Sequence, residues 1–265
     1  MTDANRATDR TVLKRLGKST NSWGVSKETV SLVRLRSDSV VIQVPAHPQR
    51  VEMDLKRSAL VIVDMQNDFC STGGWLASIG VDTTPLRSIV EPIRAISTQL
   101  RSLGVPVIWL NWGNRSDQAN LPPGVLHVYN PDGEGVGIGD ELPISGSRVL
   151  ESGSWSAGPL SGLDPSSSDI WVEKYRMSGF HDTPLDSILR NLDVTTLLFG
   201  GVNVDQCVFA TLIDAASLGY DIVLLSDCSA TTSPEFCVQS THYNVAQCFG
   251  FVATSDDVMT ALNKA

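Results

Sequence analysis

The amino-acid sequence predicts an α/β fold, a three-layer sandwich in which helices cover both faces of a central parallel sheet. Short apolar runs, typical of strands buried on both faces, alternate along the chain with helical patterns. Apolar residues make up 42% of the 265 residues, which is enough for a sizeable core. The chain contains no internal repeat or low-complexity segment, and we expect one main domain at residues 56–265.

Residues 1–55 are expected to form an N-terminal extension to this domain. Residues 31–44 (SLVRLRSDSVVIQV) alternate between apolar and polar side chains as a strand does. We expect this stretch to form a hairpin or to lie across a neighbouring subunit. Residues 1–31 are polar, with no apolar segment of the kind found in a signal peptide.

The expected elements of the main domain begin with a strand at residues 59–63 (ALVIV), a continuous apolar run. A helix is expected at residues 85–103, where Gly104 ends it. Residues 111–168 are rich in glycine and proline and are expected to be a long functional loop. Further strands are expected at residues 105–110, 170–172, 195–199, 222–225 and 250–252, and further helices at residues 185–192, 208–218, 234–247 and 255–262.

The overall charge limits the partners of the chain. A net charge of −9 and a pI near 4.8 argue against nucleic acid or an anionic membrane, since both require a basic face. No apolar run reaches the roughly 18–20 residues of a membrane span. The five cysteines are scattered and include no CxxC motif, so we expect no disulfide framework, no zinc site and a cytoplasmic location.

Three reactive side chains fall at the ends of predicted strands. Asp64 follows the strand at 59–63, Lys174 follows the strand at 170–172, and Cys207 follows the strand at 195–199 after a glycine-rich turn. In a parallel sheet these strand ends share one edge, where ligands bind. Each residue alone has a plainer explanation, respectively a turn cap, a surface charge and a core thiol. Their coincidence at one edge favours a functional site.

The chemistry of these groups points to nucleophilic catalysis. Cys207 lies at a strand-to-helix turn, where backbone N–H groups and a helix N-terminus favour a thiolate that attacks a carbonyl. Asp64 is expected to take the thiol proton and deliver it to a leaving amine. Lys174 is expected to stabilise the thiolate and hold the Asp64 carboxylate in place. Backbone N–H groups of the turn at 202–207 are the natural source of an oxyanion hole.

Three motifs resemble those of the isochorismatase-like cysteine hydrolases. They are residues 59–69 (ALVIVDMQNDF), residues 174–185 (KYRMSGFHDTPL) and residues 200–208 (GGVNVDQCV) with Thr211. The resemblance extends from about residue 55 to the C-terminus and implies the isochorismatase-like fold. It also implies a triad of Cys207, Asp64 and Lys174. It further implies a cis peptide between Val202 and Asn203, with the N–H groups of Asn203 and Cys207 as the oxyanion hole.

The branch of the family is suggested by further segments. Residues 178–190, 153–155 and 249–252 are similar to ureidoacrylate amidohydrolases, whose relatives include biuret and triuret hydrolases. Residues 110–114 (LNWGN) lack the Asp-x-His metal motif of nicotinamidases, so we expect no metal and no cofactor. The resemblance therefore implies a metal-independent cysteine amidohydrolase that cleaves the C–N bond of a small ureido or carbamoyl compound. Five residues are expected to contact substrate: Phe69, Asn111, Trp112, Met177 and Gln247. For Asp68 we expect a structural role in the first loop.

Two other hypotheses remain open at this stage. The same triad could act on another amide, such as biuret, triuret, a lactam, a nicotinamide-like amide or a xenobiotic carbamate. Alternatively, the chain could be a non-catalytic binding protein on the same fold. The enzymes that it resembles are usually dimers or tetramers, so a homodimer or homotetramer is expected.

Overall fold

The computed structural model describes residues 13–18, 20–34 and 38–264, and its centre is a six-stranded parallel sheet. The strands lie in the order β11-β10-β9-β6-β7-β8, and every neighbouring pair is parallel. Their bounds are β6 (Ser58–Val63), β7 (Val107–Trp112), β8 (Ile170–Lys174), β9 (Thr196–Val202), β10 (Asp221–Ala230) and β11 (Phe251–Ala253). The prediction of a parallel sheet between helices is confirmed.

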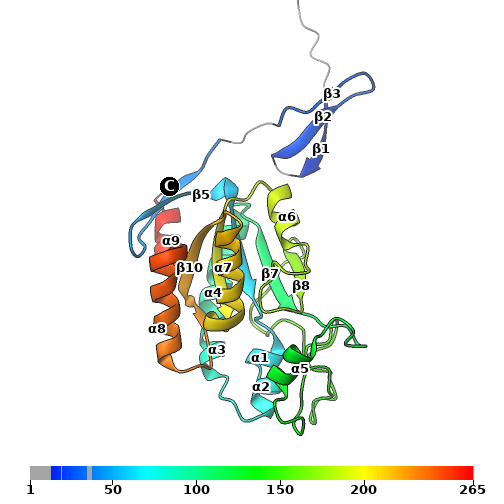
Figure 1. Cartoon of the computed structure of the whole chain (residues 1–265). Helices are drawn as coiled ribbons and strands as arrows, with labels where there is room; N and C mark the ends of the chain where they lie inside the picture. The colour runs from blue at the N-terminus through cyan, green and yellow to red at the C-terminus, as the bar shows by residue number, and fades with distance from the viewer. Residues whose placement is uncertain (1–12, 19, 35–37, 265) are drawn as a thin grey trace, which may run out of the picture.

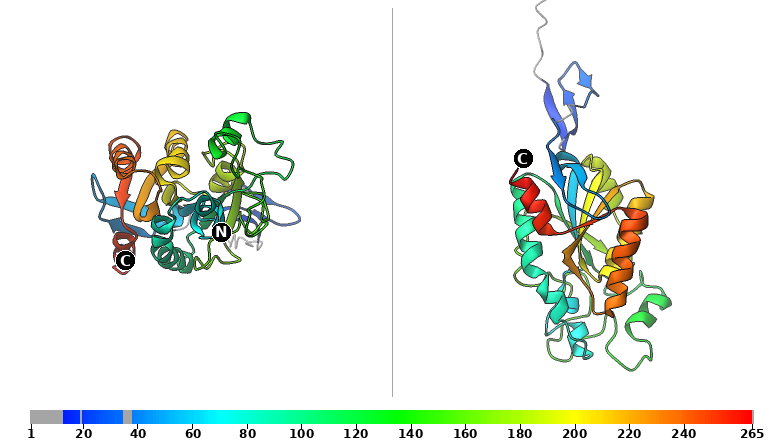
Figure 2. Two further views of the ribbon diagram at one scale, coloured as in Figure 1. Left: turned by 90° about the horizontal axis from the view of Figure 1, so that it is seen from below. Right: turned by 90° about the vertical axis from the view of Figure 1, so that its left-hand side faces the viewer.

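Helices cover both faces of the sheet and complete three layers (Figure 2). One face carries α4 (Val90–Ser102) and α9 (Ser255–Leu262), and the other carries α6 (Leu185–Asn191), α7 (Phe209–Ser217) and α8 (Glu235–Asn244). Every residue of β6, β7 and β9 is buried, as expected for strands covered on both faces. Because these three strands form the rigid middle of the core, the residues at their carboxyl ends are held firmly.

Several elements differ from the sequence prediction. The helix expected at 85–103 is two helices, α3 (Thr84–Ser88) and α4, because Pro92 cannot donate to the Ser88 carbonyl and is tolerated only in the first turn of α4. The loop expected at 111–168 contains α5 (Pro123–Tyr129), which begins at a proline. Lys174 is the last residue of β8 and does not follow the strand. The helix expected at 234–247 ends at Asn244, and a π-helical turn, Val245–Phe249, follows it.

Two short helices that the sequence did not predict lie at the carboxyl edge of the sheet. They are α1 (Asn67–Cys70) and α2 (Trp75–Ser78), and Figure 1 places them beside α5 at this edge. A second π-helical turn, Val204–Val208, precedes α7 and contains Cys207. These irregular elements surround the ends of β6 and β9.

The N-terminal extension forms two small antiparallel sheets. The first joins β1 (Lys14–Lys18), β2 (Asn21–Val25) and β3 (Val30–Ser31), and the second joins β4 (Val41–Val44) to β5 (Val51–Asp54). Within the stretch at 31–44, which was expected to form a hairpin or to lie across a neighbouring subunit, residues 41–44 pair antiparallel with residues 51–54. Among the described residues, no helix is long and apolar enough to cross a membrane.

Gly201 allows the two central strands to approach closely, which yields a test. Its φ is +115°, and a Cβ built there would collide with the Val63 carbonyl oxygen of β6. We expect Gly201→Ala to lower the free energy of unfolding by about 3 kcal/mol or more, since strain adds to overpacking. Gly219→Ala is the matched control: its φ is +90°, but a Cβ there meets open space, so we expect a loss of about 1 kcal/mol. Equal losses in urea denaturation would contradict this account.

Candidate active site

Asp64 lies immediately after β6, at the centre of the sheet. Its φ of +51° turns the chain sharply out of the strand, and its N–H donates to the Leu110 carbonyl of β7 at 2.9 Å. Only 1% of the Asp64 side chain is exposed. The carboxylate is therefore held in a dry environment by the ends of two core strands.

Lys174 reaches Asp64 from β8, two strands away. Its Nζ lies 2.8 Å from Asp64 Oδ2, and none of its side chain is exposed. The Nζ also lies 4.5 Å from the centre of the Trp112 ring, at the end of the intervening strand β7, and donates to the Arg176 carbonyl at 3.2 Å. Trp112 therefore forms the surface over which the ammonium group reaches the carboxylate.

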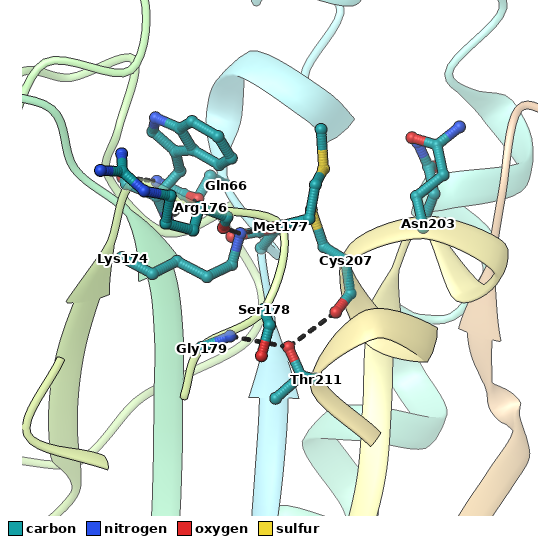
Figure 3. Close-up of polar contacts among 12 residues, drawn as sticks. Gln66, Lys174, Arg176, Met177, Ser178, Gly179, Asn203, Cys207 and Thr211 are labelled. Carbon is teal, nitrogen blue, oxygen red and sulfur yellow. Dashed lines mark hydrogen bonds and ion pairs between the residues drawn. The ribbon is translucent and has the colours of Figure 1, made fainter. Parts of the chain in front are cut away.

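Cys207 enters the site from the π-helical turn after β9. Its Sγ lies 3.7 Å from Met177 Sδ, and the side chains of Lys174, from the end of β8, and Met177, from the loop after β8, approach it (Figure 3). The Thr211 hydroxyl donates to the Cys207 carbonyl at 2.7 Å and accepts the Gly179 N–H at 3.0 Å. This hydroxyl ties the lysine motif to the cysteine turn. The peptide bond between Val202 and Asn203 is cis, as the resemblance implied.

The pKa directions follow from burial and from the three charges together. Burial raises the pKa of Asp64 above its ordinary range, although the Lys174 ammonium opposes the shift. Burial alone lowers the pKa of Lys174, but the negative groups beside it outweigh burial and raise that pKa, so the side chain stays charged. Burial raises the pKa of the Cys207 thiol to about 12, with Lys174 opposing. Burial thus opposes the thiolate that the helix N-terminus was expected to favour, and it raises the pKa of the carboxyl that was expected to take the thiol proton.

A cavity of about 210 Å³ opens onto Cys207 and Asp64. Its walls are mixed, with apolar side chains next to the polar groups of Asn203, Gln206 and Thr232. The residues that line it are Asp64, Phe69, Trp75, Leu76, Val128, Tyr129, Met177, Val202, Asn203, Gln206, Cys207 and Thr232. A space of this size accommodates a small molecule.

The residues expected to contact substrate divide into two groups. Phe69 and Met177 line the cavity, as does Asn203, which was expected in the oxyanion hole. Asn111 and Trp112 do not line it: both are buried in β7, and Trp112 packs under Lys174. Gln247 is exposed in the turn after α8 and does not line it either. The sequence placed Asn111 and Trp112 in the loop after a strand at 105–110, whereas β7 extends two residues further, to Trp112.

Several residues important to the site were missing from the sequence prediction. Trp75 and Tyr129 line the cavity, with ring centres 4.8 Å apart, and both lie on short helices that lack an extended periodic pattern. The Gln66 side chain donates to the Trp112 carbonyl at 2.8 Å and accepts the Trp112 N–H at 2.7 Å. The amide group thus fastens the loop after β6 to the end of β7. The only available signal was the position of Gln66 within the first motif.

Asp68 has the structural role expected for it. Its carboxylate accepts the N–H of Trp75 at 3.1 Å and that of Leu150 at 2.7 Å, which joins α2 to the loop before β8. Burial raises its pKa to about 6, although these hydrogen bonds oppose the shift. The walls of the cavity therefore depend on a second buried carboxylate.

The three-layer fold, with reactive groups at the carboxyl edge of its parallel sheet, has the arrangement that α/β enzymes share. Residues 58–257 match the isochorismatase domain model, and the chain therefore belongs to the isochorismatase family. The ureidoacrylate amidohydrolase RutB of Klebsiella pneumoniae is 31% identical over 85% of this chain and 95% of that protein. The protein of the same name from Stutzerimonas stutzeri is 32% identical over 86% of this chain and 92% of that protein.

Solved structures agree with this assignment. A cysteine hydrolase from Pseudomonas syringae pv. phaseolicola superposes with a TM-score of 0.68 and 25% identity, covering 86% of this chain and 99% of that chain. The N-carbamoylsarcosine amidase from Thermoplasma acidophilum superposes with a TM-score of 0.59 and 26% identity, covering 76% of this chain and 97% of that chain. By their names these two kinds of relative are an amidohydrolase and an amidase, that is, enzymes that hydrolyse carbon–nitrogen bonds.

The buried ion pair makes a direct prediction about stability. We expect Lys174→Met to lower the free energy of unfolding by about 3 kcal/mol at pH 8, because it leaves Asp64 buried without a partner. The loss should be smaller at pH 5, where a carboxylate of raised pKa takes up a proton. The double variant Asp64→Asn with Lys174→Met should recover part of the loss.

Urea denaturation at the two pH values measures these differences. Arg115→Met is the matched control, since Arg115 pairs with Asp117 at the surface, and it should change stability much less. A Lys174→Met protein as stable as the wild type at pH 8 would show that the ion pair is not needed for folding.

Proposed function

We propose that the chain is a cysteine amidohydrolase that cleaves the C–N bond of a small ureido or carbamoyl compound, with Cys207 as nucleophile. The observation that carries the proposal is that Cys207 and Asp64 open onto one cavity while Lys174 lies 2.8 Å from the same carboxylate. A buried thiol with a carboxylate that accepts its proton is the arrangement that nucleophilic catalysis requires.

The proposed reaction begins with proton transfer. The Asp64 carboxylate takes the proton of the Cys207 thiol as Sγ attacks the substrate carbonyl carbon, so no thiolate accumulates in the resting enzyme. Because burial raises the pKa of Asp64, its carboxylate is a stronger base than an ordinary aspartate. The Lys174 ammonium keeps this carboxylate ionised and oriented.

The tetrahedral intermediate then collapses. The N–H groups of Asn203 and Cys207 stabilise its oxyanion, and the N–H groups of Gln206 and Val208 both donate to the Asn203 carbonyl, which holds this turn in shape. As the C–N bond breaks, Asp64 returns the proton to the leaving nitrogen, which departs as ammonia or an amine. Water attacks the remaining thioester with Asp64 as base, which frees the acid product and restores the thiol.

The substrate class is supported by two kinds of relative. RutB is named for ureidoacrylate and the amidase for N-carbamoylsarcosine, and both names denote compounds with a carbamoyl or ureido group. The cavity of about 210 Å³ accommodates a compound of this size, and Phe69, Trp75 and Met177 form apolar walls for its carbon chain. We propose a ureidoacrylate-like compound as the first substrate to assay.

The five free cysteines support a cytoplasmic location.

The nucleophile is tested by substitution and by mass. We expect Cys207→Ser to lower kcat at least a hundredfold for ammonia release from ureidoacrylate, since a hydroxyl is a much weaker nucleophile at this position. Electrospray mass spectrometry of acid-quenched wild type should reveal an adduct of the acyl mass on Cys207.

Cys248→Ser is the matched control, because Cys248 is exposed and away from the cavity, and it should retain full activity. Full turnover by Cys207→Ser would overturn the thioester mechanism. Release of ammonia from biuret, a lactam or nicotinamide, and not from ureidoacrylate, would retain the mechanism and replace the substrate. No turnover of any amide, together with tight binding of one, would favour a binding protein.

The base role of Asp64 predicts the acid limb of the pH profile. Only the ionised carboxylate accepts a proton, so kcat/KM should rise with pH through the pKa of Asp64. Since burial raises that pKa, the midpoint should lie above about 3.9, the ordinary value for aspartate. Glu91→Gln, at an exposed carboxylate, should leave the profile unchanged. An acid limb below pH 4 would contradict the assignment of Asp64 as base.

A further inference from the structure

The three-stranded sheet of the N-terminal extension, residues 13–34, projects away from the rest of the molecule (Figures 1 and 2). We call this sheet the arm. It lies at the amino edge of the central sheet, opposite the candidate active site. The arm contacts the rest of the chain through hydrogen bonds at the start of β2. The Thr20 hydroxyl donates to the Asp193 carboxylate at 3.1 Å, and the Asn21 side-chain amide donates to the Asn191 side-chain carbonyl at 3.0 Å. Its outer hairpin extends beyond these contacts.

One face of the arm is apolar and exposed. The pairing register places Leu16 opposite Trp23, and Val25 opposite Val30, so these side chains lie on the same face. The exposed fractions are 62% for Leu16, 40% for Trp23 and 56% for Val30. A small sheet with an uncovered apolar face is only marginally stable alone, so such a face is expected to be covered.

The opposite face of the arm is already occupied by its own residues. The Arg15 guanidinium donates to the Ser22 hydroxyl at 2.6 Å, and Ser22 is buried. A Cβ on Gly24 would meet the Leu13 side chain. The arm is therefore one-sided, with its apolar face open.

Charge divides the chain in the same way as shape. Residues 13–34 contain five lysines and arginines against one acidic residue, whereas residues 38–265 contain twelve against twenty-six. Lys14 and Lys18 lie two residues before and two residues after Leu16 on β1, so their side chains share its face. The open face of the arm thus combines apolar and positive groups, while the remainder of the chain is strongly acidic.

A groove continues the open face onto the rest of the chain. Its volume is about 580 Å³, and Lys18 of the arm forms one side of it. The other side includes Val105, Pro106, Ile170 and Ile188 at the amino edge of the central sheet. The arm and the chain below it therefore present one continuous surface.

We propose that the open face of the arm packs against the acidic main domain of a second copy of this chain. Leu16, Trp23 and Val30 supply the apolar contact, and Lys14 and Lys18 face carboxylates of the partner. In a two-fold assembly each arm reaches the other copy, which builds a homodimer or half of a homotetramer. Nucleic acid or an anionic membrane is a poorer partner, because the acidic main domain repels both.

Light scattering after size exclusion tests this assembly. We expect the full chain to elute as a dimer or tetramer, and Trp23→Glu to raise its dissociation constant at least tenfold, since it buries a charge in the apolar contact. Thr29→Glu, at the exposed turn of the outer hairpin, adds the same charge off the open face and should leave the mass unchanged. A monomeric wild type, or an unchanged mass for Trp23→Glu, would overturn the proposal.

Cross-linking of the wild type keeps the test independent of folding in the variants. A mixture of ¹⁴N and ¹⁵N chains is treated with a carbodiimide, which joins lysines to nearby carboxylates. We expect Lys14 to form mixed-isotope links to acidic residues within 38–265. Links of Lys14 within single chains only, or a monomer that binds duplex DNA or anionic vesicles, would overturn the proposal.

Discussion

The ion pair between Asp64 and Lys174 connects parts of the sheet that are not neighbours, and the geometry of the site depends on it. β6 and β8 are separated by β7, and Lys174 reaches the carboxylate only by passing over Trp112. Both charges are removed from water, so each needs the other to remain ionised in the core. The same pairing holds the Asp64 carboxyl group at the cavity onto which Cys207 opens. Stability and the proposed proton transfer therefore rest on one contact.

The frame around this pair is built from two different kinds of structure. Its base consists of the buried strands β6, β7 and β9, where Gly201 permits close approach of neighbouring backbones. Its walls come from short helices and loops that buried polar side chains fasten to that base. Gln66 ties the first loop to β7, and Asp68 joins two wall segments. A rigid base with separately attached walls lets a family keep its reaction while the pocket changes.

The two edges of the central sheet carry different kinds of surface. The carboxyl edge gathers the reactive groups and the cavity, while the amino edge carries the arm and its groove. An assembly built through the arm leaves the cavity accessible, since the two surfaces lie at opposite edges. The acidic main domain that disfavours nucleic acid is the same surface that suits a basic arm.

The sequence by itself determined the parallel sheet and the three residues Asp64, Lys174 and Cys207 at its carboxyl edge. A continuous apolar run indicates by itself that a strand is buried on both faces. Once the strands form a parallel sheet, the residues that follow them lie at one edge of it. Only the tertiary structure decided the pocket walls: Tyr129 and Trp75 line the cavity from short helices, while Asn111 and Trp112 are buried in β7. It also decided the direction of the Cys207 pKa shift, because that pKa is raised by burial under residues far away in the chain. The periodicity of apolar residues reports the secondary structure and burial of a single segment. The cavity walls and the pKa values depend on which distant segments pack together.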